Sequence, residues 1–176
     1  MSIYDELDRL VKDGSLFRLV PALPGTPVVR TMFASKEVND LITGPWRDRK
    51  WEERCGSLRA DLDRFITGGL ITAAVDPFKG GKQANIKQLD PYPDEVWEIR
   101  SRVPRPGIRV LGRFADTDVF VALTWWHREP LRGPGSKEWR AAIVECRVKW
   151  RNLFLAYDPK SGADIHDYIS GDVVSI

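Results

Sequence analysis

At 176 residues the chain is long enough to bury a core, and we expect one domain over residues 1–176. Its 43% hydrophobic and 30% charged residues are ordinary for a globular protein, and without a long apolar run we expect neither a signal peptide nor a membrane span. The formal net charge of +2 hides a basic middle, with fifteen Lys/Arg against nine Asp/Glu over residues 79–151, which suits a polyanionic partner.

Residues 1–45 are predicted to form an N-terminal elaboration of the domain. A short first helix is indicated by apolar residues at helical spacing, which are Ile3, Leu7, Leu10 and Val11. Residues 16–20 and 28–33 read as two strands that could form a hairpin. A brief helix, for which Ser35 is a suitable N-cap, is then expected to end at Gly44.

Two longer helices are predicted over residues 47–67 and 137–154, because apolar residues recur there at steps of four, three, four and three. These residues are Trp51, Cys55, Leu58, Leu62 and Phe65 in the first helix, and Trp139, Ile143, Cys146, Trp150 and Leu153 in the second. Between the helices, residues 70–75 read as a short strand that we expect at an edge of the sheet. The loop that follows, 78–87, is glycine-rich and basic but matches no nucleotide-binding motif.

The cysteines and histidines give no sign of a metal site. Cys55 and Cys146 lie on the apolar stripes of the predicted helices, where cysteine acts as a small hydrophobe, and a reduced cytoplasmic setting is the natural assumption. His127 and His166 are far apart and lack the spacing of zinc ligands. We therefore expect no metal and no other cofactor.

The segment 96–125 reads as three strands joined by turns at 104–107 and 115–118. We predict an α+β fold: a twisted, mainly antiparallel sheet, made of this three-strand meander plus an edge strand, packed with the two longer helices and carrying the N-terminal extension. Several arginines then fall on adjacent strands, namely Arg100, Arg102, Arg109 and Arg113. Guanidinium groups on a rigid sheet can hold a phosphodiester, although a solvated sheet face would show the same alternation.

The order of these segments resembles that of a known family. VWEIR at 96–100, GIRVLG at 107–112 and VFVAL at 119–123 follow a helix and a short strand, and this pattern is similar to the core of RelE/HigB-type toxins of the RelE/ParE superfamily. The resemblance covers about residues 46–157 and leaves 158–176 as a C-terminal tail. It implies a cytoplasmic toxin of a toxin–antitoxin system, acting as a metal-independent endoribonuclease on mRNA at the ribosome. An antitoxin-like protein is the implied partner.

The resemblance also implies a set of site residues. Arg100 and Arg109 carry over to phosphate binding and transition-state stabilisation, and Lys87 to a second cation or the proton acceptor. His127, at the exit of the last strand, is a candidate catalytic proton shuttle, although a lone histidine is often structural. Contacts with RNA are expected from four arginines and from a tryptophan that would stack on a base: Arg102, Arg113, Arg128, Arg132 and Trp126. Alternatively, Trp125 and Trp126 both pack under the helices.

Two departures from the family pattern keep other functions open. The chain is longer than a typical family member. It also lacks the dense lysines that the family has before the meander, with only Lys79, Lys82 and Lys87 there. The leading alternative is a non-catalytic interaction protein on the RelE fold that binds a protein partner through an aromatic surface, which seven tryptophans could supply. A ParE-like topoisomerase inhibitor is the other alternative, and the sequence leaves an oligomer open.

Overall fold

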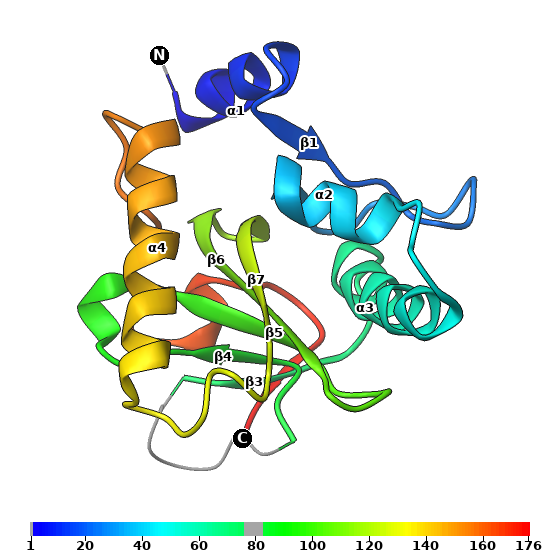
Figure 1. Ribbon diagram of the computed structural model, residues 1–176. Helices are drawn as coiled ribbons and strands as arrows, with labels where there is room; N and C mark the ends of the chain where they lie inside the picture. Colours follow the sequence, from blue (N-terminus) through cyan, green and yellow to red (C-terminus); the bar gives the residue numbers. More distant parts are fainter. Residues whose placement is uncertain (1, 76–82) are drawn as a thin grey trace.

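The computed structural model describes residues 2–75 and 83–176 (Figure 1). The basic loop predicted over 78–87 therefore lies partly outside the described residues, and Lys79 and Lys82 with it. The helices of the described part are α1 (Ile3–Lys12), α2 (Lys36–Thr43), α3 (Arg49–Ile66) and α4 (Lys137–Leu153), with the short 3-10 helices η1 (Tyr92–Asp94) and η2 (Ile165–Asp167). Its strands are β1 (Leu16–Arg18), β2 (Thr31–Ser35), β3 (Ile71–Ala74), β4 (Ile86–Gln88), β5 (Trp97–Ser101), β6 (Ile108–Asp116), β7 (Val119–His127) and β8 (Val173–Ser175).

All of these strands belong to one eight-stranded sheet in the order β1-β2-β7-β6-β5-β4-β3-β8. The pairs β2–β7, β3–β4 and β3–β8 are parallel, and the others are antiparallel. The fold-class prediction is therefore wrong, because it named a mainly antiparallel meander with one edge strand and two helices. The meander β5-β6-β7 is only the centre of a wider, mixed sheet with four α-helices, and β3, expected at an edge, has β8 outside it.

The prediction failed where a strand pairs with a distant part of the chain. β2 lies parallel to β7, with Thr31 opposite Val119 and Ala34 opposite Ala122. It is covered on both faces, since Met32 and Phe33 are both buried. A strand that is buried on both faces shows no alternation of apolar and polar residues, so its sequence does not reveal which neighbours it has.

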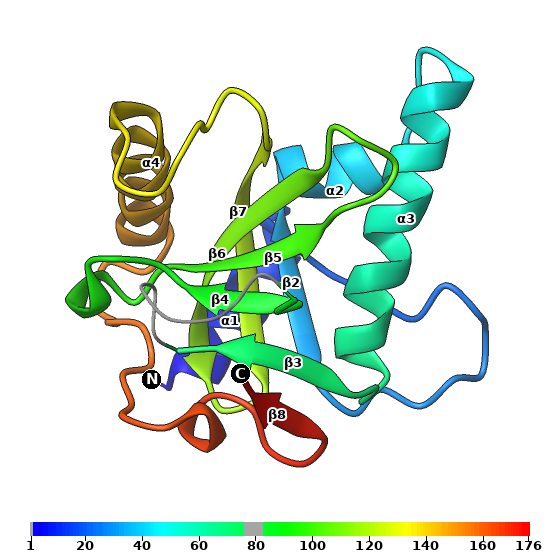
Figure 2. The ribbon, with the colours of Figure 1, turned by 90° about the horizontal axis from the view of Figure 1, so that it is seen from below.

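The helices cover the two faces of the sheet (Figures 1 and 2). α2 and α3 lie on one face, and α1 and α4 lie on the other. On the α2–α3 face, Leu58 and Phe65 of α3 pack in one cluster with Trp97 and Phe120 of the sheet. On the α1–α4 face, residues of both helices pack against the sheet in a separate cluster, which includes Leu7, Ile143, Trp150, Leu111 and Val121.

The helices begin at side-chain caps that the sequence supplies. Asp48 Oδ1 accepts a hydrogen bond from the backbone N–H of Trp51, and Ser136 Oγ accepts one from Trp139, at 2.9 and 3.2 Å. Such caps satisfy backbone donors that have no partner within the helix. In the described ranges, 2–75 and 83–176, none of the helices combines the length and apolarity that crossing a bilayer requires.

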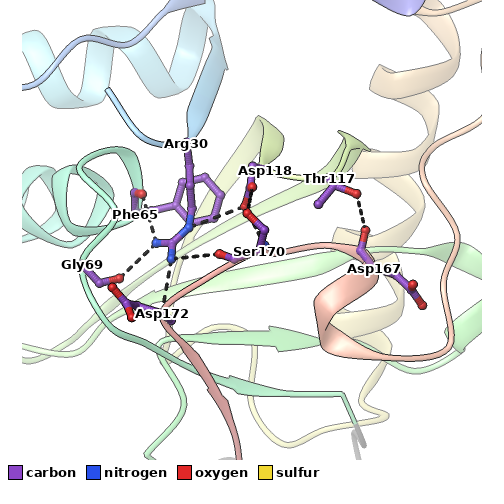
Figure 3. Close-up of polar contacts among 8 residues, drawn as sticks. All are labelled: Arg30, Phe65, Gly69, Thr117, Asp118, Asp167, Ser170 and Asp172. Atoms are coloured by element: carbon purple, nitrogen blue, oxygen red, sulfur yellow. Dashed lines mark hydrogen bonds and ion pairs between the residues drawn. The ribbon is translucent and has the colours of Figure 1, made fainter. Parts of the chain in front are cut away.

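The C-terminal segment is tied into the domain by a buried arginine (Figure 3). Arg30, which is 1% exposed, donates hydrogen bonds to the carbonyls of Gly69 and Asp172 at 3.0 and 3.3 Å. Its Nε lies 3.6 Å from Asp118 Oδ1, and that carboxylate also accepts the backbone N–H of Ser170 at 2.9 Å. The residues 158–176, predicted as a tail, thereby add β8 to the sheet edge.

Candidate functional site

A pocket of about 240 Å³ lies between the sheet and the beginning of α4, and we call it the α4 pocket. Lys87 of β4, Glu98 and Arg100 of β5, and Arg128 just after β7 contribute its charged lining, with Asp90 at the rim. Trp139 and Ile143 of α4, together with Leu89, form an apolar wall. The pocket therefore combines three cations and two carboxylates with an aromatic surface.

Strand alternation directs the charged residues toward α4. Trp97 and Ile99 of β5 and Val110 of β6 belong to the core on the α2–α3 side. Because neighbouring residues of a strand point to opposite faces, Glu98 and Arg109 point to the α4 side. The strand register brings these charged residues next to one another, with the pairs Lys87↔Glu98 and Arg100↔Arg109.

Glu98 is the centre of this cluster and is only 1% exposed. Its Oε1 accepts a hydrogen bond from Arg100 Nε at 2.8 Å. Its Oε2 lies 3.3 Å from Arg109 Nε, without hydrogen-bond geometry to any described residue. Two guanidinium groups thus share one carboxylate, which leaves positive charge in excess beside the pocket.

Arg109 lies behind Glu98 and belongs to a second, smaller hollow. Burial lowers the pKa of Arg109 to about 10, with Glu98 opposing the shift and neighbouring cations adding to it, so the side chain stays charged at neutral pH. This hollow measures about 180 Å³ and is lined by Arg102, Arg105 and Arg109; we call it the turn pocket. Arg128 lines both hollows and connects them.

His127 is not brought together with these arginines. Arg109 faces Trp126 across the strand pair, so Trp126 shares its face of the sheet, and His127 points to the other face. There the imidazole packs on Trp51 and Trp125, with ring centroids 5.2 and 5.5 Å apart. Burial, followed by repulsion from Arg54 and Arg47, lowers the pKa of His127.

Two of the predicted RNA-binding arginines lie outside both hollows. Arg113 is buried, stacks on the Trp150 ring at 5.4 Å and donates a hydrogen bond to the carbonyl of Asp94 at 2.6 Å. Arg132 is exposed and forms an ion pair with Glu138 at 3.5 Å. The α4 pocket and the turn pocket thus collect five of the nine residues predicted for the site, which are Lys87, Arg100, Arg102, Arg109 and Arg128.

Sequence reasoning missed two residues of the α4 pocket. Glu98 was read only as part of the VWEIR strand, although its position two residues before Arg100 already placed both side chains on one face. Trp139 was assigned to the core stripe of α4. Its ring does pack there, but its Nε1 is buried without a hydrogen-bond partner among the described residues, and the side chain lines the pocket.

In residues 2–75 and 83–176 no three His, Cys, Asp or Glu side chains are grouped so that they could hold a metal ion. The polar and aromatic side chains that line the two hollows are arginines, a lysine, carboxylates and a tryptophan. Comparison of the chain with protein-family models, with curated proteins and with solved structures found no match.

Proposed function

We propose that this protein binds single-stranded RNA at the α4 pocket and cleaves it without a metal ion, as the toxin of a toxin–antitoxin system. The observation that carries the proposal is the meeting of Lys87, Arg100 and Arg128 around one pocket with an aromatic wall. Cations bind the phosphate of RNA, and aromatic rings stack on its bases. Arg109 adds positive charge from behind Glu98.

The reaction that such a site can promote begins with attack of a ribose 2′-hydroxyl on the adjacent phosphorus. A new P–O2′ bond forms and the P–O5′ bond breaks, which leaves a 2′,3′-cyclic phosphate and a 5′-hydroxyl. Asp90 at the rim is a carboxylate that can take the 2′-hydroxyl proton, and Lys87 can give a proton to the leaving oxygen. Arg100 and Arg128 stabilise the charge that builds up on the phosphate.

The family resemblance supplies the biological setting of the proposal. mRNA on the ribosome is the substrate, the cytoplasm is the compartment, and an antitoxin-like protein is the partner that restrains the activity. To inhibit the enzyme directly, that partner would cover the α4 pocket or the turn pocket.

The test is cleavage of a labelled RNA, free and on ribosomes, by the purified protein in the presence of a chelator. Arg100→Ala should lower the rate roughly 10²–10³-fold, as expected for loss of a transition-state donor. Arg49→Ala is the control, because that side chain is 89% exposed on α3 and lines neither the α4 pocket nor the turn pocket. If neither RNA binding nor a cyclic phosphate product is detected with the wild-type protein, the proposal is wrong.

A non-catalytic interaction protein is the second candidate, and one surface favours it. A hollow of about 490 Å³ on the α2–α3 side is lined by Trp46, Trp125, Leu41 and Arg47. Tryptophan and arginine are enriched where proteins bind tightly to one another. Tight binding of a partner protein that is lost in Trp46→Ala, without RNA cleavage by the wild type, would support this candidate instead.

A further inference from the structure

We infer that the turn pocket binds the terminal phosphate of an RNA strand, a phosphomonoester dianion. For its RNA context this inference rests on the proposed function, which it deepens. Three features carry it: the excess of positive charge in the turn pocket, the small size of that pocket, and the arginine that it shares with the α4 pocket.

The lining of the turn pocket carries four arginines and a single carboxylate. The arginines are Arg102, Arg105, Arg109 and Arg128, and the carboxylate is Glu129. Within residues 2–75 and 83–176, only Arg109 of these four arginines forms an ion pair, and its partner Glu98 is shared with Arg100. The hollow therefore holds positive charge in excess, which a bound anion would neutralise.

Backbone carbonyls hold three of these arginines in place. Arg109 Nη1 donates hydrogen bonds to the carbonyls of Ser101 and Ile108, at 3.2 and 3.1 Å. Arg102 and Arg128 each donate a hydrogen bond to another backbone carbonyl. A carbonyl orients a guanidinium group without cancelling its charge. It also uses only part of the five N–H donors of that group, so donors remain for a ligand.

The guanidinium groups lie close enough to repel one another. Gly107 lines the turn pocket, and a Cβ atom at this position would lie 3.2 Å from Arg109 Nη1, so the guanidinium group of Arg109 lies beside the wall of the hollow. Burial lowers the pKa of Arg109, and repulsion from neighbouring arginines, Arg102 and Arg128 among them, adds to the shift. Like charges gathered in this way are typical of functional sites, and a bound anion would relieve their repulsion.

The size of the turn pocket suits a phosphate group at the end of a chain. Its volume of about 180 Å³ is below the roughly 300–1,000 Å³ of sites that enclose a whole drug-sized ligand, so a nucleoside would stay outside. A phosphomonoester carries a charge of about −1.5 to −2 at pH 7 and has three acceptor oxygens. An internal phosphodiester carries a single negative charge and has a ribose on either side. Several guanidinium groups around a small hollow therefore favour the chain end.

The shared arginine favours RNA as the source of this phosphate. Arg128 lines the α4 pocket as well as the turn pocket, so a strand bound in the α4 pocket has a cation along its way to the turn pocket. A phosphopeptide offers the same phosphate but lacks bases that could stack on the aromatic wall of the α4 pocket. RNA is therefore the ligand that uses both hollows.

The experiment is isothermal titration calorimetry of the full chain with a trinucleotide of 2′-O-methyl RNA, which lacks the attacking hydroxyl and cannot be cleaved. The strand carries a 5′-phosphate, a 3′-phosphate or no terminal phosphate. The wild type should bind one of the phosphorylated strands roughly tenfold or more tightly than the unphosphorylated strand, because charge-assisted hydrogen bonds form. Inorganic phosphate at millimolar concentration should compete with that strand.

Arg105→Ala is the test variant, because it removes an exposed side chain of the turn pocket and keeps the backbone carbonyl to which Arg54 donates a hydrogen bond at 3.2 Å. It should reduce the effect of the terminal phosphate on affinity to about threefold or less. Arg140→Ala is the matched control, because it removes the same charge from an exposed position of α4 that lines neither hollow. It should leave the effect unchanged, and thermal unfolding checks that both variants fold.

The outcomes separate the terminal-phosphate inference from the proposed function. Equal affinity for phosphorylated and unphosphorylated strands, or a preference that Arg105→Ala lowers no more than Arg140→Ala does, overturns the inference even if RNA is cleaved. A phosphoserine peptide that binds more tightly than the phosphorylated strands also overturns it. A preference for the terminal phosphate that depends on Arg105 supports the inference even if no RNA is cleaved, in which case only the proposed function fails.

Discussion

Arg109 and Glu98 form a buried ion pair on neighbouring strands, with Nε 3.3 Å from Oε2, on the face of the sheet that α4 covers. Arg100 binds the other oxygen of the same carboxylate at 2.8 Å. Charged groups at this depth are tolerated because opposite charges lie beside one another, so the cluster affects both the stability of the sheet and the charge of the pocket.

Removing Arg109 should therefore destabilise the protein. We expect Arg109→Met to lower the free energy of unfolding by roughly 3 kcal/mol, at the lower end for a broken buried pair because Arg100 still neutralises Glu98. The free energy of unfolding of both proteins is measured by urea denaturation. The double variant E98Q/R109M should recover part of the lost free energy of unfolding. Lys36→Ala is the control, because it removes the exposed ion pair between Lys36 and Asp40 and should change the free energy of unfolding by about 0.5 kcal/mol or less. If Arg109→Met is as stable as the wild type, the ion pair between Glu98 and Arg109 contributes nothing to stability.

Arg128 should contribute to RNA affinity through a phosphate contact. If it does, Arg128→Ala lowers the slope of log affinity against log salt concentration by about 0.7, the value for one phosphate contact on a single strand. Fluorescence anisotropy with a labelled oligonucleotide at several salt concentrations measures the slope. Arg49→Ala should leave it unchanged, because Arg49 lies on the other face. An unchanged slope in Arg128→Ala would show that Arg128 makes no contact with an RNA phosphate.

Arg30 should be essential for docking the C-terminal segment (Figure 3). Arg30→Lys keeps the charge but cannot reach the separate carbonyls of Gly69 and Asp172 together, because an ammonium group lacks the guanidinium fork. We expect a loss of roughly 2–3 kcal/mol in unfolding free energy. Amide hydrogen exchange should become faster in β8. Arg18→Lys, on an exposed position of β1, is the control, and unchanged exchange in β8 would contradict the role given to Arg30.

His127 should make the protein less stable in acid. Its folded-state pKa lies below the ordinary value of 6.5, so as the pH falls below about 6.5 the unfolded chain takes up the proton first. The free energy of unfolding should therefore decrease between pH 7 and pH 5. His127→Phe keeps a ring between Trp51 and Trp125 and should reduce this decrease. His166→Phe is the control, because His166 is exposed, and the same pH dependence in wild type and His127→Phe would exclude His127 as its source.

Local sequence determined the two long helices and the three central strands of the sheet. Apolar steps of four and three predicted α3 and α4, and turn residues bounded the strands β5, β6 and β7. The same alternation placed Arg100 and Arg109 on adjacent strands, where they are in register. These features depend on residues close in sequence, which is why a pattern can predict them.

Only the tertiary structure decided how those elements combine. β2 and β8 join the sheet through partners far away in the sequence, Val119 and Ile71 among them, and no local pattern encodes such pairing. The cross-strand register likewise put Trp126, and not His127, on the face of Arg109. Packing of α4 over that face placed Trp139 and Glu98, which belong to elements far apart in the sequence, in the lining of one pocket. A site formed by long-range packing has no signature in sequence spacing, because the distance between its residues is set by the fold.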